Sequence, residues 1–208
     1  MRFFIILLFL SSLCFSQETI VPISPALTKS LHKGLNQLAS EQREDGSWQG
    51  SYGRNVGETS LCLMAFMAMG NLPGEGEYGH VVSKGVDWII KQAKPNGLIQ
   101  YTNQERQAAV MYGHALATLM LSEAWGQSQN PKVGKVLRNA VKLILEVQGP
   151  KGGWGYKSVP YDGDTSVCVM QVIALKSAQE AGIYVPQKTI QKALSLIKTR
   201  FNEGSKMY

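Results

Sequence analysis

Apolar residues recur at helical spacing along most of the chain, in two kinds of stretch. In the first kind only one face is apolar, as shown by Leu31, Leu35 and Leu38, and this pattern predicts amphipathic helices. The second kind is apolar nearly all round, which is typical of a helix buried among other helices. The stretches of the second kind cover residues 58–70, 112–125 and 164–181.

The two kinds of stretch alternate along the chain. We expect the first amphipathic helix to begin near Thr28 or Ser30, which are suitable capping residues, and further ones to cover residues 81–94 and 187–199. Another ends near Gln148. Each is followed by a glycine-containing turn, and the first three then lead into an apolar helix. The unit is therefore a helical hairpin.

One turn motif, Gln-x-x-x-Gly-x-Trp, follows two of the amphipathic helices. Its residues are Gln42, Gly46 and Trp48 in the first copy and Gln148, Gly152 and Trp154 in the second. A glycine after a helix adopts the left-handed conformation without a Cβ clash. The Gln amide can satisfy exposed backbone groups, and the indole can cover an apolar edge. We interpret these six residues as a structural repeat motif.

Degenerate copies of the unit fill the rest of the chain. Small residues in the amphipathic helices mark the register at Gly34, Gly85, Ala140 and Ala193, with steps of 51, 55 and 53 residues. The second unit keeps the turn glycine but has Ala93 and Ile99 in place of Gln and Trp. In the fourth unit the glycine is Gly204, one residue early.

The motif resembles the "QW" repeat of squalene and hopene cyclases, within the wider group of terpenoid cyclases and protein prenyltransferases. The resemblance covers residues 30–208. It implies an all-α fold, an α/α toroid in which helices before the turns form an outer ring and helices after them form an inner ring around a cavity. The chain would form part of a toroid, because it holds about three and a half helix pairs and the closed ring of the family takes about six.

The first residues have the pattern of a secretory signal peptide. Arg2 precedes an apolar run, and Cys14 and Ser16 are small residues at the positions that a signal peptidase reads. The run is too short to span a membrane. The sequence predicts an exported protein, whether periplasmic, cell-surface or secreted; an uncleaved anchor is the alternative.

The chain therefore divides into a signal peptide at 1–16, an extended arm at 17–29 and the repeat domain at 30–208. With 17% charged and 44% hydrophobic residues, its composition is that of a globular protein. The net charge of +6 includes no run of Lys and Arg, so we expect no nucleic-acid partner. The three cysteines, one of them in the signal, form no disulfide framework.

Polar residues gather where the three apolar helices begin. They are Glu58, Thr59, Ser60, Tyr112, His114, Asp164 and Thr165. If these helices line a cavity, their starts form one rim, where unpaired backbone N–H groups and the positive end of each helix dipole can hold a ligand. The alternative is that these side chains only cap the helices.

The segment containing Asp162 and Asp164 resembles the DxDD motif of terpenoid cyclases only in part. That family uses the middle aspartic acid of the motif to protonate the isoprenoid. Aligning Asp164-Thr165-Ser166 with the end of the motif places Gly163 at the acid position. The proton donor is missing, so Asp162, Asp164 and His114 are weak catalytic candidates.

Two cysteines, Cys62 and Cys168, could be metal ligands. Glu58 lies four residues before Cys62, and Asp164 lies four residues before Cys168, so each pair shares a helix face. With His114 these are possible zinc ligands. The spacing differs from the Asp-x-Cys of the prenyltransferases, and buried cysteines in apolar helices are more often core residues. We therefore predict no metal and no other cofactor.

The chain keeps the repeat of the family but lacks its proton donor and its zinc-ligand spacing. This combination predicts a binding scaffold. Its partner would be an apolar small ligand, or another protein chain at the open end of the repeat stack, where an apolar face lacks a neighbouring unit. The alternative is an isoprenoid cyclase or a prenyltransferase-type enzyme whose active site is completed by repeats beyond residue 208. That alternative depends on the resemblance alone.

Overall fold

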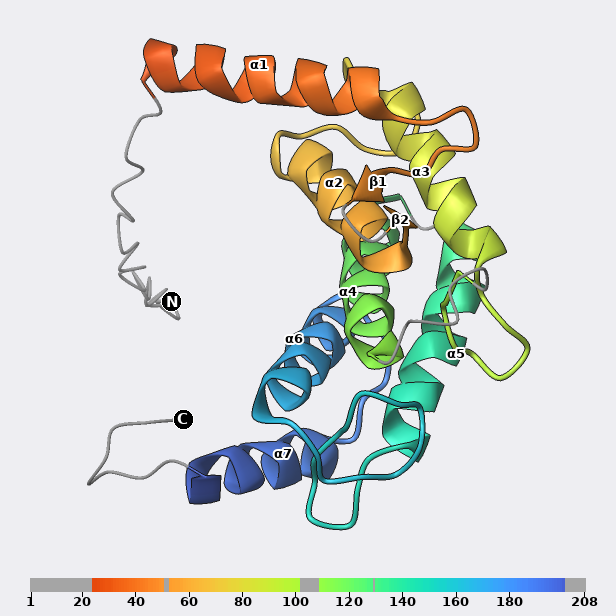
Figure 1. The fold of residues 1–208 in the computed structure, drawn as a ribbon, viewed down its shortest axis with the longest axis vertical. Helices are drawn as coiled ribbons and strands as arrows, with labels where there is room; N and C mark the ends of the chain where they lie inside the picture. The colour runs from red at the N-terminus through yellow and green to blue at the C-terminus, as the bar shows by residue number, and fades with distance from the viewer. Residues whose placement is uncertain (1–23, 51–52, 102–108, 129, 201–208) are drawn as a thin grey trace, which may run out of the picture.

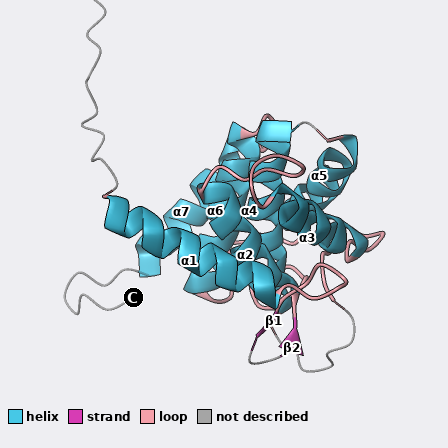
Figure 2. Ribbon diagram, turned by 90° about the horizontal axis from the view of Figure 1, so that it is seen from above, coloured by secondary structure: helices cyan, strands magenta, loops and turns pink. Residues whose placement is uncertain are grey.

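The computed structural model describes residues 24–50, 53–101, 109–128 and 130–200. Over these residues the chain is built from helices, apart from one two-stranded hairpin, β1 (Gln49–Gly50) and β2 (Gly53–Arg54). This confirms the predicted all-α fold of helical hairpins. Figure 2 shows the small hairpin at the edge of the helices.

The helices form two layers. The outer layer consists of α1 (Pro25–Glu41), α3 (Gly79–Lys91), α5 (Pro131–Glu146) and α7 (Gln187–Arg200). The inner layer consists of α2 (Val56–Ala68), α4 (Val110–Ser128) and α6 (Thr165–Glu180). In Figure 1 the inner helices follow the inside of an arc, α3 and α5 lie on its outside, and α1 and α7 lie at its two ends.

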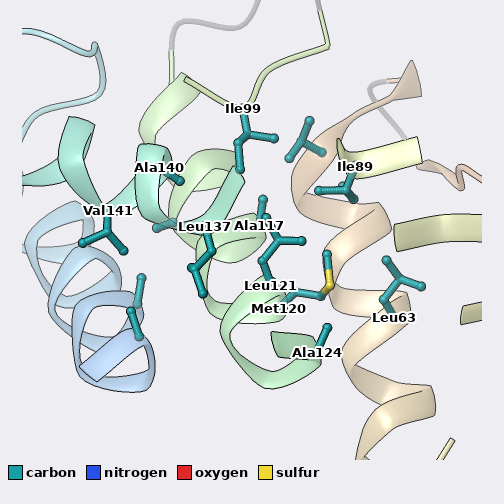
Figure 3. Packing of buried hydrophobic residues seen from close by; sticks show 14 of the residues in the cluster. Leu63, Ile89, Ile99, Ala117, Met120, Leu121, Ala124, Leu137, Ala140 and Val141 are labelled. Carbon is teal, nitrogen blue, oxygen red and sulfur yellow. The ribbon is translucent and has the colours of Figure 1, made fainter. Parts of the chain in front are cut away.

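The core fills the space between the layers, and α4 lies at its centre. Met120 and Leu121 of α4 are completely buried, as are Leu137 on α5 and Leu63 on α2. Figure 3 shows these side chains meeting between the two layers. Because α4 packs against both α2 and α6, it needs apolar residues on most of its circumference. This explains why its sequence is apolar nearly all round.

Helix α1 begins earlier than predicted. Ser24 caps it, because its Oγ accepts a hydrogen bond from Leu27 N at 3.2 Å, and Pro25 follows at the first helical position. Residues 25–29 are thus helical and are not the end of an extended arm, which corrects the prediction. Residues 1–23 and Gly204 lie outside the described residues.

The glycine turn of each hairpin packs directly on the outer helix of the next hairpin. Gly46, Gly97 and Gly152 have φ angles of 96°, 90° and 107°. A Cβ on them would lie 2.3, 2.3 and 2.6 Å from a backbone oxygen of α3, α5 or α7. These oxygens belong to Lys84, Asn139 and Lys192, each one residue before the small register residue of its helix. Only glycine permits this approach.

The Gln side chain of the motif fastens the same junction. Nε2 of Gln42 donates to Gly46 O at 3.1 Å and to Val81 O of α3 at 2.9 Å. Nε2 of Gln148 donates to Gly152 O at 3.0 Å and to Thr189 O of α7, also at 3.0 Å. Each Gln therefore joins its own turn to the first turn of the next outer helix.

The Trp side chain joins the turn to the helix before it. The indole Nε1 of Trp48 donates to Leu38 O at 2.8 Å, and that of Trp154 donates to Ile144 O at 2.8 Å. Both rings are almost completely buried. The two copies of the motif thus make the same contacts, although 106 residues separate them.

We predict that Gly152→Ala destabilises the protein more than Gly182→Ala does. Both glycines have positive φ, but a Cβ on Gly182 meets nothing within 4 Å. Gly182→Ala should cost about 1–2 kcal/mol of unfolding free energy from backbone strain. Gly152→Ala should cost about 1–3 kcal/mol more, because α7 must move away. Urea unfolding of the two variants measures the difference; equal losses would contradict the close packing of the turn.

Candidate functional site

The three inner helices begin close together. A Cβ on Gly113 of α4 would lie 3.5 Å from the backbone N of Gly57 on α2. Tyr112 of α4 hydrogen-bonds through its hydroxyl to the Ser166 hydroxyl of α6. The starts of α2, α4 and α6 therefore gather at one end of the inner layer, as the rim hypothesis requires.

Several predicted rim residues are nevertheless inside the protein. Thr59, Ser60 and His114 are completely buried. The Ser60 hydroxyl donates to Val56 O of its own helix at 2.7 Å. These three side chains are core residues and do not form part of an accessible rim. Those that remain partly accessible are Glu58, Tyr112, Asp164 and Thr165.

The buried polar residues share a structural task that the sequence analysis missed. The backbone N–H of Trp48 donates to Thr59 Oγ1, and that of Trp154 donates to Cys168 Sγ, both at 3.2 Å. In the second unit Ile99 replaces Trp, and the backbone N–H of Ile99 donates to His114 Nδ1 at 3.2 Å. The inner helix of each unit thus supplies one acceptor for the same buried backbone donor.

His114 is held neutral by these contacts. Its Nδ1 accepts from Ile99, so its Nε2 carries the proton and lies 3.3 Å from Ala140 O. Burial lowers the pKa of the imidazole to about 4, although the hydrogen bond to Ala140 opposes this shift. Both ring nitrogens are engaged within the core, so the geometry does not support a catalytic base.

The cysteines show no metal-binding arrangement. Burial raises the pKa of the Cys62 thiol to about 11, with the negative charges of Glu41 and Glu58 adding to the shift, so the thiolate that binds zinc is disfavoured. Cys168 is completely buried and faces the Trp154 backbone. Within the described ranges, no three His, Cys, Asp or Glu side chains come together in a way that could hold a metal ion.

Asp162 anchors the loop before α6. Its carboxylate accepts hydrogen bonds of 2.9 Å from the backbone N–H groups of Lys151 and Gly153, in the turn of the second motif copy. Burial alone would raise its pKa, but these hydrogen bonds and the charge of Lys151 lower the pKa below its usual value. Asp162 is thus a structural anion.

Asp164 is the cap of α6. It accepts from Ser166 N at 2.8 Å, from Val167 N at 3.2 Å and from the Tyr156 hydroxyl at 3.0 Å. The hydrogen bond from the Ser166 hydroxyl is the largest cause of its lowered pKa, and those from Tyr156 and the backbone add to it. A group that protonates a hydrocarbon needs the opposite, a raised pKa. The geometry therefore supports the capping role.

The inner helices carry apolar side chains that are partly or largely exposed, although Ala65 and Leu119 also pack against the core. These apolar side chains are Leu61 and Ala65 on α2, Leu116 and Leu119 on α4, and Val169 and Ile173 on α6. We call this set the inner face. Leu61, Val169 and Ile173 are 52%, 40% and 43% exposed. These residues belong to the helices that follow the inside of the arc (Figure 1).

Acidic groups lie near both ends of the inner face. Glu58 stands at the start of α2, where its carboxylate packs on Gly50 of the hairpin. At the far ends of α4 and α6, Glu123 and Glu180 line a small polar pocket with Ser177. The inner helices carry only one cation, Lys176, against these three acids. The inner helices themselves therefore carry a net negative charge, which disfavours anions.

Comparison with known proteins supports a distant relationship. Over 135 residues, which cover 61% of this chain, the sequence is 26% identical to lanosterol synthase of Aspergillus fumigatus. The chain is similar to a terpenoid cyclase. The match spans 17% of the relative's length, so it supports a terpenoid-cyclase-like fold and does not carry over an activity. No protein-family model matches the sequence.

None of the helices in the described residues combines the length and the apolar character that crossing a bilayer requires.

We predict that buried His114 makes stability fall in mild acid. Its pKa of about 4 in the folded state is below the ordinary value of 6.5, so the unfolded chain binds the proton more tightly. This contribution to stability is present above pH 6.5 and is lost as the pH falls towards 4, by roughly 3 kcal/mol. Urea unfolding between pH 7 and 4 should show a shallower loss in His114→Gln than in the wild type. If the unfolding free energies of the two proteins fall in parallel with pH, the imidazole of His114 is not buried in its neutral form.

Proposed function

We propose that this chain is a binding scaffold that holds a neutral, apolar ligand of the isoprenoid type on its inner face. The observation that carries the proposal is the exposure of Leu61 on α2 and of Val169 and Ile173 on α6, the two helices that flank α4. Contiguous exposed apolar residues rimmed by polar groups mark binding sites. The polar rim is provided by Tyr112 and Ser166 at one end and by Glu123 and Ser177 at the other.

The charges support a neutral ligand. A diphosphate or a carboxylate on the inner face would lie near Glu58 and Asp164, or near Glu123 and Glu180. The cations that could offset this repulsion are Lys176 of α6 and Arg200 of α7, which donates a hydrogen bond to Thr165 at the start of α6. A prenyltransferase substrate carries a diphosphate, so this arrangement counts against the prenyltransferase alternative. The relative is named for making lanosterol, which is a neutral and largely apolar molecule.

A terpenoid cyclase remains the second candidate, and the similarity to lanosterol synthase favours it. Its acid would have to be a residue other than Asp162 or Asp164, since hydrogen bonds lower the pKa of both carboxyls. Conversion of a bound polyene into a cyclic product, detected by mass spectrometry, would establish the enzyme in place of the scaffold.

We predict that farnesol binds to the protein and that Ile173→Asp weakens binding at least about tenfold, because a carboxylate would be desolvated against the ligand. Leu194 on α7 is the matched control, since it is 44% exposed, compared with 43% for Ile173, and lies off the inner face. Leu194→Asp should leave the Kd, measured by isothermal titration calorimetry, unchanged. Farnesyl diphosphate should bind more weakly than farnesol.

Two results would overturn this assignment. The first is an absence of binding to both farnesol and a sterol. The second is an equal loss of affinity in Ile173→Asp and Leu194→Asp, which would place the ligand elsewhere.

We also propose that the scaffold acts outside the cytoplasm, from the signal-peptide pattern of residues 1–16. Expression in a secreting host should yield a mature protein whose N-terminus is Gln17, and intact-mass measurement checks this. A mass that retains residues 1–16 in the exported fraction would favour an uncleaved anchor.

A further inference from the structure

The charge of the protein is concentrated in its second half. Residues 131–200 hold eleven Lys and Arg against four Asp and Glu, whereas residues 24–130 hold eight against nine. The excess lies mainly on two outer helices, and the seven exposed cations on them are Lys132, Lys135, Arg138 and Lys142 of α5 and Lys188, Lys192 and Lys198 of α7. We call these seven residues the basic surface.

The two helices of the basic surface meet where α5 ends and α7 begins. Gln148, just after α5, donates a hydrogen bond of 3.0 Å to Thr189 O of α7, between Lys188 and Lys192. The turn at Gly152 also packs on the Lys192 side chain. Figure 1 shows the lower end of α5 beside the start of α7.

The basic surface does not stabilise the fold through ion pairs. Lys142 is paired with Glu146 at 3.6 Å, and in the described part of the chain no carboxylate is paired with the other six cations. Arg138 instead lies over the Trp125 ring, 5.7 Å from its centroid. Like charges three or four residues apart on a helix repel each other, as Lys132 and Lys135 do on α5 and Lys188 and Lys192 do on α7. Their arrangement favours an external anion.

We propose that the basic surface docks the protein on an anionic lipid bilayer. Lys and Arg near such a surface are attracted by its negative potential, and several of them act together. The cations are spread over two helices at exposed positions, which suits a broad surface. Neither α5 nor α7 has an aromatic residue on which nucleic-acid bases could stack.

A nearby tyrosine supports the lipid surface. Tyr184 is 82% exposed and lies in the loop that leads into α7, four residues before Lys188. Tyrosine is favoured at the boundary between lipid and water, because its ring is apolar and its hydroxyl is polar. An anion of the same charge in free solution, such as phosphate, would gain nothing from this side chain.

Co-sedimentation with vesicles tests the proposal on the mature protein. Wild-type protein should bind phosphatidylcholine vesicles that contain phosphatidylglycerol, and it should not bind pure phosphatidylcholine vesicles. The variant Lys132→Gln/Lys135→Gln/Lys188→Gln/Lys192→Gln should lose at least about tenfold in affinity. The control Lys29→Gln/Lys33→Gln/Lys84→Gln/Lys91→Gln removes the same charge from exposed sites on α1 and α3 and should change affinity by less than about threefold.

Three results would overturn the proposal. Equal losses in the two quadruple variants would show that only net charge matters and would overturn the docking surface. Release of the vesicle-bound protein by millimolar inorganic phosphate at constant ionic strength, or tighter binding to a single-stranded oligonucleotide than to vesicles, would overturn the lipid as its partner. Unfolding midpoints of both variants, measured in parallel, should equal or exceed that of the wild type, because repulsion is removed.

Discussion

The whole arrangement depends on the contact of a glycine turn with the backbone of the next outer helix. At Gly46, Gly97 and Gly152 the turn approaches so closely that a single Cβ would collide with a carbonyl oxygen. The position of each outer helix is thereby fixed by the hairpin before it. The position of each inner helix is then restricted as well, because the chain enters it directly from the same turn. Local backbone conformation at three residues sets the curvature of the arc.

The Gln and Trp side chains show why the motif is unevenly preserved. In the second unit Ala93 and Ile99 replace them, and the turn glycine at Gly97 remains. Ile99 still donates its backbone N–H to the inner helix, but to the imidazole of His114. The constraint thus acts on the backbone donor, which must be satisfied in the core, and side chains as different as Thr, His and Cys can satisfy it. A histidine that looks functional in the sequence is thereby explained as a structural acceptor.

The sequence predicted what depends on local pattern. Helical periodicity located the helices to within a few residues, and the recurrence of Gln, Gly and Trp identified the unit. The start of α1 was misplaced because Ser24 and Pro25 are as suitable for a helix start as Thr28. Burial could not be predicted for Thr59 and His114, because both follow helix starts that resemble solvent-exposed caps. The bonds that Asp162 makes to Lys151 and Gly153 join positions too far apart in the sequence for any local pattern to reveal them.

The ionised state of Asp162 and Asp164 limits the chemistry of this segment. Both carboxylates are surrounded by hydrogen-bond donors, which stabilise the charged form and outweigh the opposing effect of burial. A fold related to the cyclases can therefore keep its turn and its inner helices while its aspartates serve as anchor and cap. The apolar inner face does not depend on that acid, because its residues belong to α2, α4 and α6, whereas Asp162 and Asp164 precede α6. Binding an apolar ligand needs no proton donor, so the proposed scaffold requires only groups that the described residues already supply, whereas a cyclase requires an acid other than Asp162 and Asp164.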